Sequence, residues 1–91
     1  MIFEEKGDKL VVFIKGDLNY LNSLELNKKA KDKKEIEIVF ECSKFIDSEG
    51  IKTLFILKKE GKKVRLKNVP DLFFKAVKIL SLDELLECVE G

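Results

Sequence analysis

The chain alternates between short, almost continuous apolar runs and longer stretches with apolar residues at helical spacing. Its first segment meets the pair Gly7-Asp8 and then five consecutive apolar residues, 10–14. This pattern predicts two strands joined by a hairpin turn that begins with glycine. Because residues 10–14 leave no polar face, we expect this strand to lie inside a sheet with helices covering both faces.

A first helix is predicted next, running to about Lys33. Asp17 and Asn19 mark a turn before it, and Asn22 or Ser23 can cap its first turn. The apolar residues that follow lie among lysines, as expected for a helix with one face on a core. Residues 35–42 then form a mostly continuous apolar run, which predicts another strand that ends in Cys42.

The second half of the chain repeats the alternation. Residues 48–60 show the broad apolar face of a helix that ends near Gly61. Val64 and Leu66 alternate with basic residues, which favours a strand near a sheet edge with one charged face. Pro70 opens a further helix, and residues 81–91 fit either a short helix or a last edge strand.

The helix predicted after Pro70 spans residues 71–80. Its expected core positions are Leu72, Phe73, Ala76, Val77 and Leu80. Only one of two adjacent helical aromatics can point directly inward, so Phe74 is expected at the rim, as a candidate contact residue.

Alternation of strands and helices predicts an open α/β sheet with right-handed crossovers between parallel strands. The chain has 91 residues, near the size of one small domain, and no stretch reads as a linker. We therefore expect one domain over residues 1–91, with a mixed sheet of four to five strands and three to four helices.

The charge balance and the residue types present limit the classes of function that the chain can have. With 18 basic and 17 acidic residues, the chain has no general attraction to nucleic acid or anionic lipid, so a protein partner is expected. No signal peptide or membrane-length apolar run is visible, which favours a cytoplasmic protein. The chain has no histidine and two distant cysteines, so we expect no metal site, no cofactor and no enzymatic activity.

One segment carries most of the chemistry, residues 45–51 with the sequence Phe-Ile-Asp-Ser-Glu-Gly-Ile. Asp47 can cap the helix that follows, and Ser48 falls in its first turn, where backbone N–H groups are unpaired. Gly50 allows another segment to approach closely. The Ser48 hydroxyl is therefore expected to be exposed.

A phosphate on Ser48 would add roughly −1.5 to −2 charges at the positive end of a helix dipole, which tolerates an anion. Asp47 and Glu49 flank the position, and Lys52 is the one evident counter-charge nearby. The modification is thus expected to leave the fold intact and to act on docked partners, through desolvation and repulsion.

Residues 45–51, together with Gly16-Asp17-Leu18-Asn19 upstream, resemble the STAS domain of bacterial anti-sigma-factor antagonists. The resemblance spans most of the chain. In that family an Asp-Ser-x-Gly-Ile/Leu turn joins a strand to a helix, and the serine is the usual phosphate acceptor. That position is Ser48 here.

The resemblance implies a partner-switching cycle in transcription regulation. The unmodified protein would bind an anti-sigma factor that is also a serine kinase, and so free a sigma factor. The kinase would inactivate it by phosphorylation, and a phosphatase would reset it. Besides the acceptor Ser48, the residues expected to support the site or contact the partner are Asp47, Glu49, Gly50, Ile51 and Asn19.

The chain departs from the family pattern at three points. Asn19 stands where an aspartate is common, Glu49 replaces a small residue beside the acceptor, and the chain ends at Gly91, about where similar domains continue into a final helix. Because of the last departure, we expect part of the sheet to be more exposed, which favours a partner that covers it or a homodimer.

Two alternatives belong to other classes. The domain could bind a nucleotide or other small ligand at the turn of Asn19 and Ser48, or act as a constitutive scaffold in a signalling complex. A serine hydrolase is disfavoured, because the nucleophile-elbow glycine before the serine and a histidine are both missing.

Overall fold

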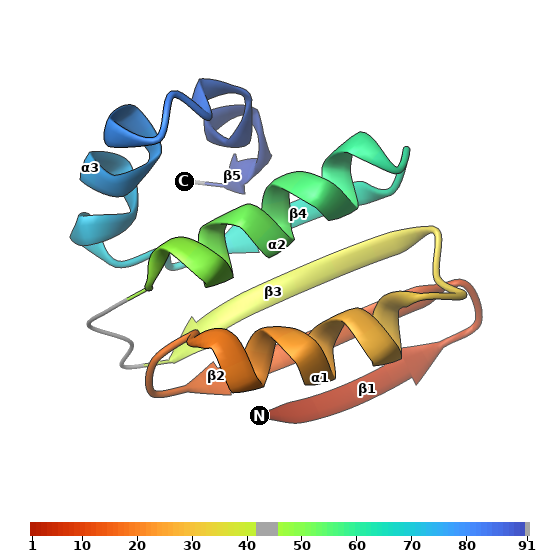
Figure 1. The fold of residues 1–91 in the computed structure, drawn as a ribbon. Helices are drawn as coiled ribbons and strands as arrows, with labels where there is room; N and C mark the ends of the chain where they lie inside the picture. Colours follow the sequence, from red (N-terminus) through yellow and green to blue (C-terminus); the bar gives the residue numbers. More distant parts are fainter. Residues whose placement is uncertain (42–45, 91) are drawn as a thin grey trace.

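The computed structural model describes residues 1–41 and 46–90 as an α/β fold with one five-stranded mixed sheet (Figure 1). The strands follow one another across the sheet in chain order, β1-β2-β3-β4-β5. The elements are β1 (Ile2–Lys6), β2 (Lys9–Lys15), α1 (Tyr20–Ala30), β3 (Glu35–Glu41), α2 (Ser48–Lys59), β4 (Lys63–Lys67), α3 (Asp71–Ile79), the 3-10 helix η1 (Asp83–Cys88) and β5 (Val89–Glu90). The predicted fold class is confirmed.

The hairpin predicted at the start of the chain is present. β1 pairs antiparallel with β2, and Ile2 lies opposite Phe13. Gly7 takes a φ of +60° in the two-residue turn, a conformation that glycine adopts without a steric penalty. All other strand pairs are parallel.

In residues 1–41 and 46–90, helices cover one face of the sheet (Figure 1), so the expectation that both faces of β2 carry helices was wrong. Each parallel strand is added on the same side of the preceding one, and crossovers of one hand then place every helix on the same face (Figure 1). Leu10, Val12 and Ile14 face this helical layer and are buried in the core. Val11 points the other way and is 4% exposed, between Glu4 and Glu37 in register.

The core is one continuous cluster between the sheet and the helices. Each helix contributes fully buried side chains, among them Leu26 of α1, Leu54 of α2 and Phe73 of α3. The strands contribute alternate residues, as the period of two requires. Burial on this one face is what holds the helices in place.

The first helix begins and ends earlier than predicted. It runs from Tyr20 to Ala30, and its N-cap is Asn19 rather than Asn22 or Ser23. Asn19 has an extended backbone and its side chain accepts the Asn22 N–H, which is the geometry of a capping residue. The predicted end near Lys33 was wrong, because the chain must turn there to enter β3.

The later helices agree better with the pattern. α2 begins at Ser48 and ends at Lys59, followed by Gly61 with a φ of +88°. Pro70 precedes α3, in which Phe73 is buried and Phe74 is 40% exposed, as predicted. Leu72 was assigned to the core but is 44% exposed.

The ambiguous C-terminal stretch contains both predicted structures in succession, η1 and then the two-residue strand β5. Cys42 and Phe45 lie outside the described residues.

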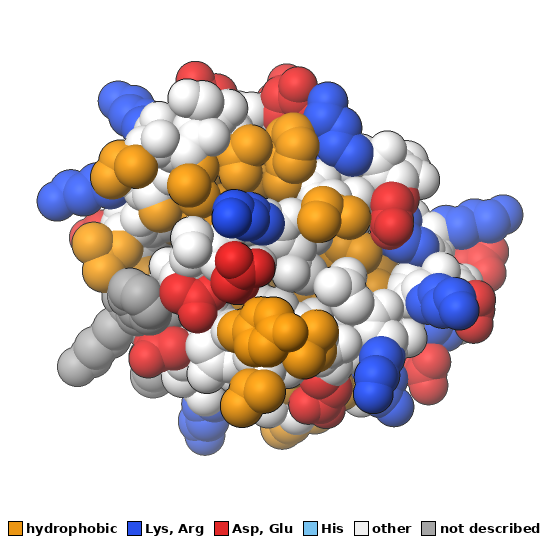
Figure 2. Space-filling view, viewed as in Figure 1, with side chains coloured by type: hydrophobic (Ala, Val, Ile, Leu, Met, Phe, Trp, Pro, Cys, Tyr) orange, Lys and Arg blue, Asp and Glu red, His pale blue; other side chains and the backbone are white. Residues whose placement is uncertain are grey.

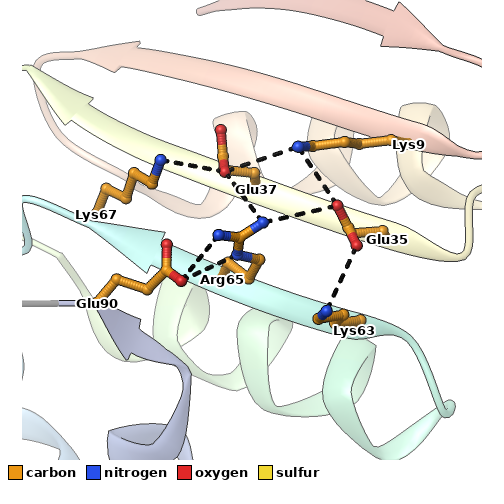
Figure 3. A network of polar contacts seen from close by, with 7 residues as sticks. All are labelled: Lys9, Glu35, Glu37, Lys63, Arg65, Lys67 and Glu90. Carbon is orange, nitrogen blue, oxygen red and sulfur yellow. Dashed lines mark hydrogen bonds and ion pairs between the residues drawn. The ribbon is translucent and has the colours of Figure 1, made fainter.

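The sheet face without helices carries a network of ion pairs in place of a second layer (Figure 3). Glu37 of β3 is 8% exposed, and its carboxylate lies 3.8 Å from Lys9, 3.7 Å from Arg65 and 3.3 Å from Lys67. Glu35 adds contacts to Lys9 and Lys63. Acidic β3 is thus held between basic residues of β2 and β4, and their long side chains cover the sheet.

We expect Glu37→Gln to lower the free energy of unfolding by about 1–2 kcal/mol, because it leaves three cations around a partly buried position without their shared counter-charge. Urea unfolding followed by circular dichroism measures the change. Glu41→Gln is the matched control, since Glu41 is an exposed residue of the same strand. Equal stability of the two variants would show that the network contributes nothing at Glu37.

Candidate functional site

Two loops meet at the carboxyl ends of β2 and β3. The loop before α1 and the loop before α2 form a parallel bridge between Leu18 and Ile46. The Asp47 N–H also donates to the Leu18 carbonyl at 3.2 Å. The sequence segments 16–19 and 46–51, which are distant in the chain, are therefore joined in space, and the starts of α1 and α2 are held together.

Gly50 makes this meeting sterically feasible. A Cβ atom at this position would lie 2.8 Å from the Leu18 carbonyl oxygen and 2.9 Å from Leu18 Cγ. Contacts that short do not occur, so any larger residue would have to push the α1 loop away from α2. The close approach expected of Gly50 is confirmed.

Asp47 caps α2. Its backbone is extended, and its carboxylate accepts the Gly50 N–H at 2.8 Å. Asn19 does the same for α1, where its Oδ1 accepts the Asn22 N–H at 3.0 Å. Asn22 in turn donates from its side chain to the Asp17 carbonyl at 2.8 Å. Both helix starts are thereby fixed by their own side chains.

Ser48 is the first residue of α2 and is exposed. Within the described part of the chain, no group forms a hydrogen bond with its hydroxyl. The neighbouring residues make the local contacts instead. Asp47 accepts the hydrogen bond that caps α2, and Glu49 forms an ion pair with Lys52 at 3.7 Å. The Ser48 side chain can therefore be altered without breaking a bond that the fold uses.

Exposed apolar side chains lie on the first turns of α1, whose start is joined to the start of α2, and farther along α2 itself. The first turns of α1 carry Tyr20, Leu21 and Leu24 at 54%, 72% and 43% exposure, and Ile56 of α2 is 50% exposed. Figure 2 shows acidic side chains over the start of α2, with hydrophobic side chains over α1 and again toward α3. Exposed apolar surface with polar residues around it is a common feature of protein interaction sites.

The other predicted site residues divide into two groups. Glu49 and Asn19 are exposed, whereas Gly50 and Ile51 are buried. Ile51 is fully buried and belongs to the core, so it can support the site only by anchoring the first turn of α2. Phe45, the first residue of the motif, lies outside the described residues.

Sequence reasoning missed the apolar residues of α1. Tyr20 and Leu24 lie one turn apart, on the side next to the buried stripe of Ser23, Leu26 and Ala30. Had the helix start been placed at Asn19, this exposed pair would have been visible from the helical spacing.

No known family model matches the chain. In residues 1–41 and 46–90, no group of three or more cysteine or acidic residues is placed to hold a metal ion. None of the helices described is long and apolar enough to cross a membrane.

Gly50→Ala should lower the free energy of unfolding by about 1–2 kcal/mol, even though alanine is the better helix former, because the new methyl group must displace the Leu18 loop. Thermal and urea unfolding test this. Lys52→Ala, an exposed change in the same helix, should be nearly neutral. A Gly50→Ala protein as stable as the wild type would disprove the close contact.

Asp47→Ala should lower the free energy of unfolding by about 1 kcal/mol, the usual effect of losing an N-cap. Asp47→Asn keeps an oxygen that can accept the Gly50 N–H and should retain most of that stability. The comparison separates the cap bond from the carboxylate charge, and equal losses in both variants would mean that charge, not the bond, is what matters.

Proposed function

We propose that the chain is a STAS-like, phosphorylation-gated binding module that acts as an anti-sigma-factor antagonist in transcription regulation. Its partner would be an anti-sigma factor with serine kinase activity, and a phosphatase would reverse the modification. Ser48 is the proposed phosphate acceptor, and the proposed location is the cytoplasm. The proposal assigns the chain no catalytic role of its own.

The observation that carries the proposal is the exposed Ser48 hydroxyl, without a hydrogen bond in the described structure, at the first position of α2. A kinase needs a side chain that it can reach, and a switch needs one whose modification does not unfold the domain. The Asp47 cap leaves Ser48 free for that purpose. The positive end of the helix dipole also tolerates the added negative charge.

Gating would follow from the surface around Ser48. A partner that covers Tyr20, Leu21 and Leu24 must also approach the serine, because the α1 loop is joined to the α2 loop. With phosphate present, binding would require desolvating a dianion beside Asp47 and Glu49. Lys52 offers only partial relief, since it already forms an ion pair with Glu49.

The test is affinity capture from the native lysate with wild-type protein, Ser48→Asp and Ser81→Asp as baits. Ser81 is exposed and lies just before η1, so it provides the same charge change at another serine. We expect a serine kinase to bind wild type and Ser81→Asp, and its capture by Ser48→Asp to fall at least tenfold. Mass spectrometry of the native protein should find phosphate on the Ser48 peptide.

Thermal unfolding is the control that shows whether Ser48→Asp is correctly folded. Ser48→Asp should unfold within about 2 °C of the wild type, because an acidic residue suits the first turn of a helix. If the folded Ser48→Asp protein retains the same partners and Ser48 never carries phosphate, the switch proposal is wrong.

A further inference from the structure

The outer edge of β4 is only partly covered by its neighbour. β4 has five residues, but β5 pairs with just two of them, Leu66 opposite Val89 and Lys67 opposite Glu90. On that side, residues 63–65 have no paired strand in the described chain. The Lys63 N–H donates to Lys34, toward β3, so the backbone groups of the next residue, Val64, point to the outer edge.

A cavity of about 400 Å³ lies along this unpaired edge, where Val64 is 6% exposed. It is bounded by the end of α2, the first half of β4 and the segment from η1 to β5, and we refer to it as the β4 notch. Its lining residues are Lys58, Lys62, Lys63, Val64, Arg65, Glu87, Cys88 and Glu90. Four of these side chains are basic and two are acidic.

The rim of the notch is fixed by ion pairs. Lys58 donates to Glu87 at 2.9 Å and to the Glu84 carbonyl at 3.0 Å. The hydrogen bond with Glu87 raises the pKa of Lys58, and the same bond lowers the pKa of Glu87, so both remain charged near neutral pH. Lys63 is freer: its side chain is 71% exposed and its ion pair with Glu35 is 3.9 Å long.

Both strands that already pair with β4 have the same side-chain pattern. On the inner side, Glu35, Ile36 and Glu37 of β3 lie opposite Lys63, Val64 and Arg65.

On the outer side, Val89 lies opposite Leu66, and Glu90 reaches Arg65 at 3.0 Å (Figure 3). In each pair, acidic residues meet the basic face of β4 and apolar residues meet its core face.

We propose that the free part of the β4 edge binds an extended segment of a partner protein in which acidic and apolar residues alternate. The segment would add a short strand beside residues 63–65, with backbone hydrogen bonds to the outer edge. Its acidic side chains would meet Lys63 and share Arg65 with Glu90, and its apolar side chains would enter the notch beside Val64 and Cys88.

Charge decides which strands can bind there. Lys63, Arg65 and Lys67 would repel the same strand of a second copy, and this is a common protection of sheet edges against self-pairing. An acidic strand would instead be attracted, because it can form ion pairs with the same basic residues that repel a second copy of β4. The edge is therefore closed to β4 itself and open to a strand that resembles β3 or β5.

This surface is separate from the proposed phosphorylation site. Ser48 begins α2 and Lys58 lies near its end, about 15 Å along the helix axis at the usual rise per residue. The inference does not depend on the proposed function, and either can fail without the other.

The test is titration of the isotope-labelled protein with the synthetic peptide Ac-Gly-Glu-Val-Glu-Val-Glu-Gly-amide, followed by amide resonances. We expect saturable shifts at residues 63–65 and at Cys88, and slower hydrogen exchange at Val64. The Glu-to-Lys version of the peptide should not bind. A peptide with alternate amides N-methylated should also fail, because it keeps its charges but loses its backbone donors.

Lys63→Glu should weaken binding of the acidic peptide about tenfold, since it replaces one attraction by a repulsion. Lys6→Glu is the matched control, because Lys6 is an exposed lysine on the opposite edge strand, and its peptide affinity should equal that of the wild type.

Several outcomes would overturn the proposal. They are no saturable binding at millimolar peptide, shifts confined to β1, equal binding of the N-methylated peptide, or equal affinity of the Lys63→Glu protein.

Discussion

The direction in which the sheet grows governs most of this structure. From β2 onward, every strand is laid parallel on the same side of the one before it, and the connecting helices are therefore confined to one face. That face becomes the apolar core, and none of the helices described lies on the other face. On the face without helices, charged side chains cover the sheet instead. Acidic residues of β3 form ion pairs there with basic residues of β2 and β4.

The same growth places the α1 and α2 loops side by side at the carboxyl ends of β2 and β3. Two short segments, 30 residues apart in the chain, meet through the Leu18 carbonyl, which accepts the Asp47 N–H and lies against Gly50. Neither segment forms a site without the other. Their contact fixes both helix starts, and the fixed helix starts in turn hold Ser48 beside the exposed apolar residues of α1.

Much of the fold could be predicted because hydrophobic periodicity is a local signal. The hairpin at Gly7, the helix at Ser48 and the cap at Asp47 each depend on residues that are close in the chain. The number of covered faces could not be predicted in this way. The apolar run 10–14 looks the same whether Val11 is covered by a helix or by the stems of charged side chains, and only the strand order distinguishes the two.

The site was predictable to a similar extent. Asp47 and Gly50 have roles that their positions in the motif suggest, whereas the apolar surface of α1 depends on where the helix begins. With the helix start predicted at Asn22 or Ser23, Tyr20 and Leu21 fall in a loop, and the pattern does not predict them as helix surface. An error of one turn in a helix boundary therefore concealed the most exposed apolar residues near the motif.

Residues 47–50 have two different roles, and this difference determines which of them can be substituted during evolution. Asp47 and Gly50 each make a contact that stabilises the fold, whereas Ser48 and Glu49 face solvent between them. The fold itself therefore tolerates changes at positions 48 and 49, provided that Asp47 and Gly50 stay the same, and any constraint on Ser48 must come from its function. Structural constraint and surface chemistry therefore fall on different residues of the same turn.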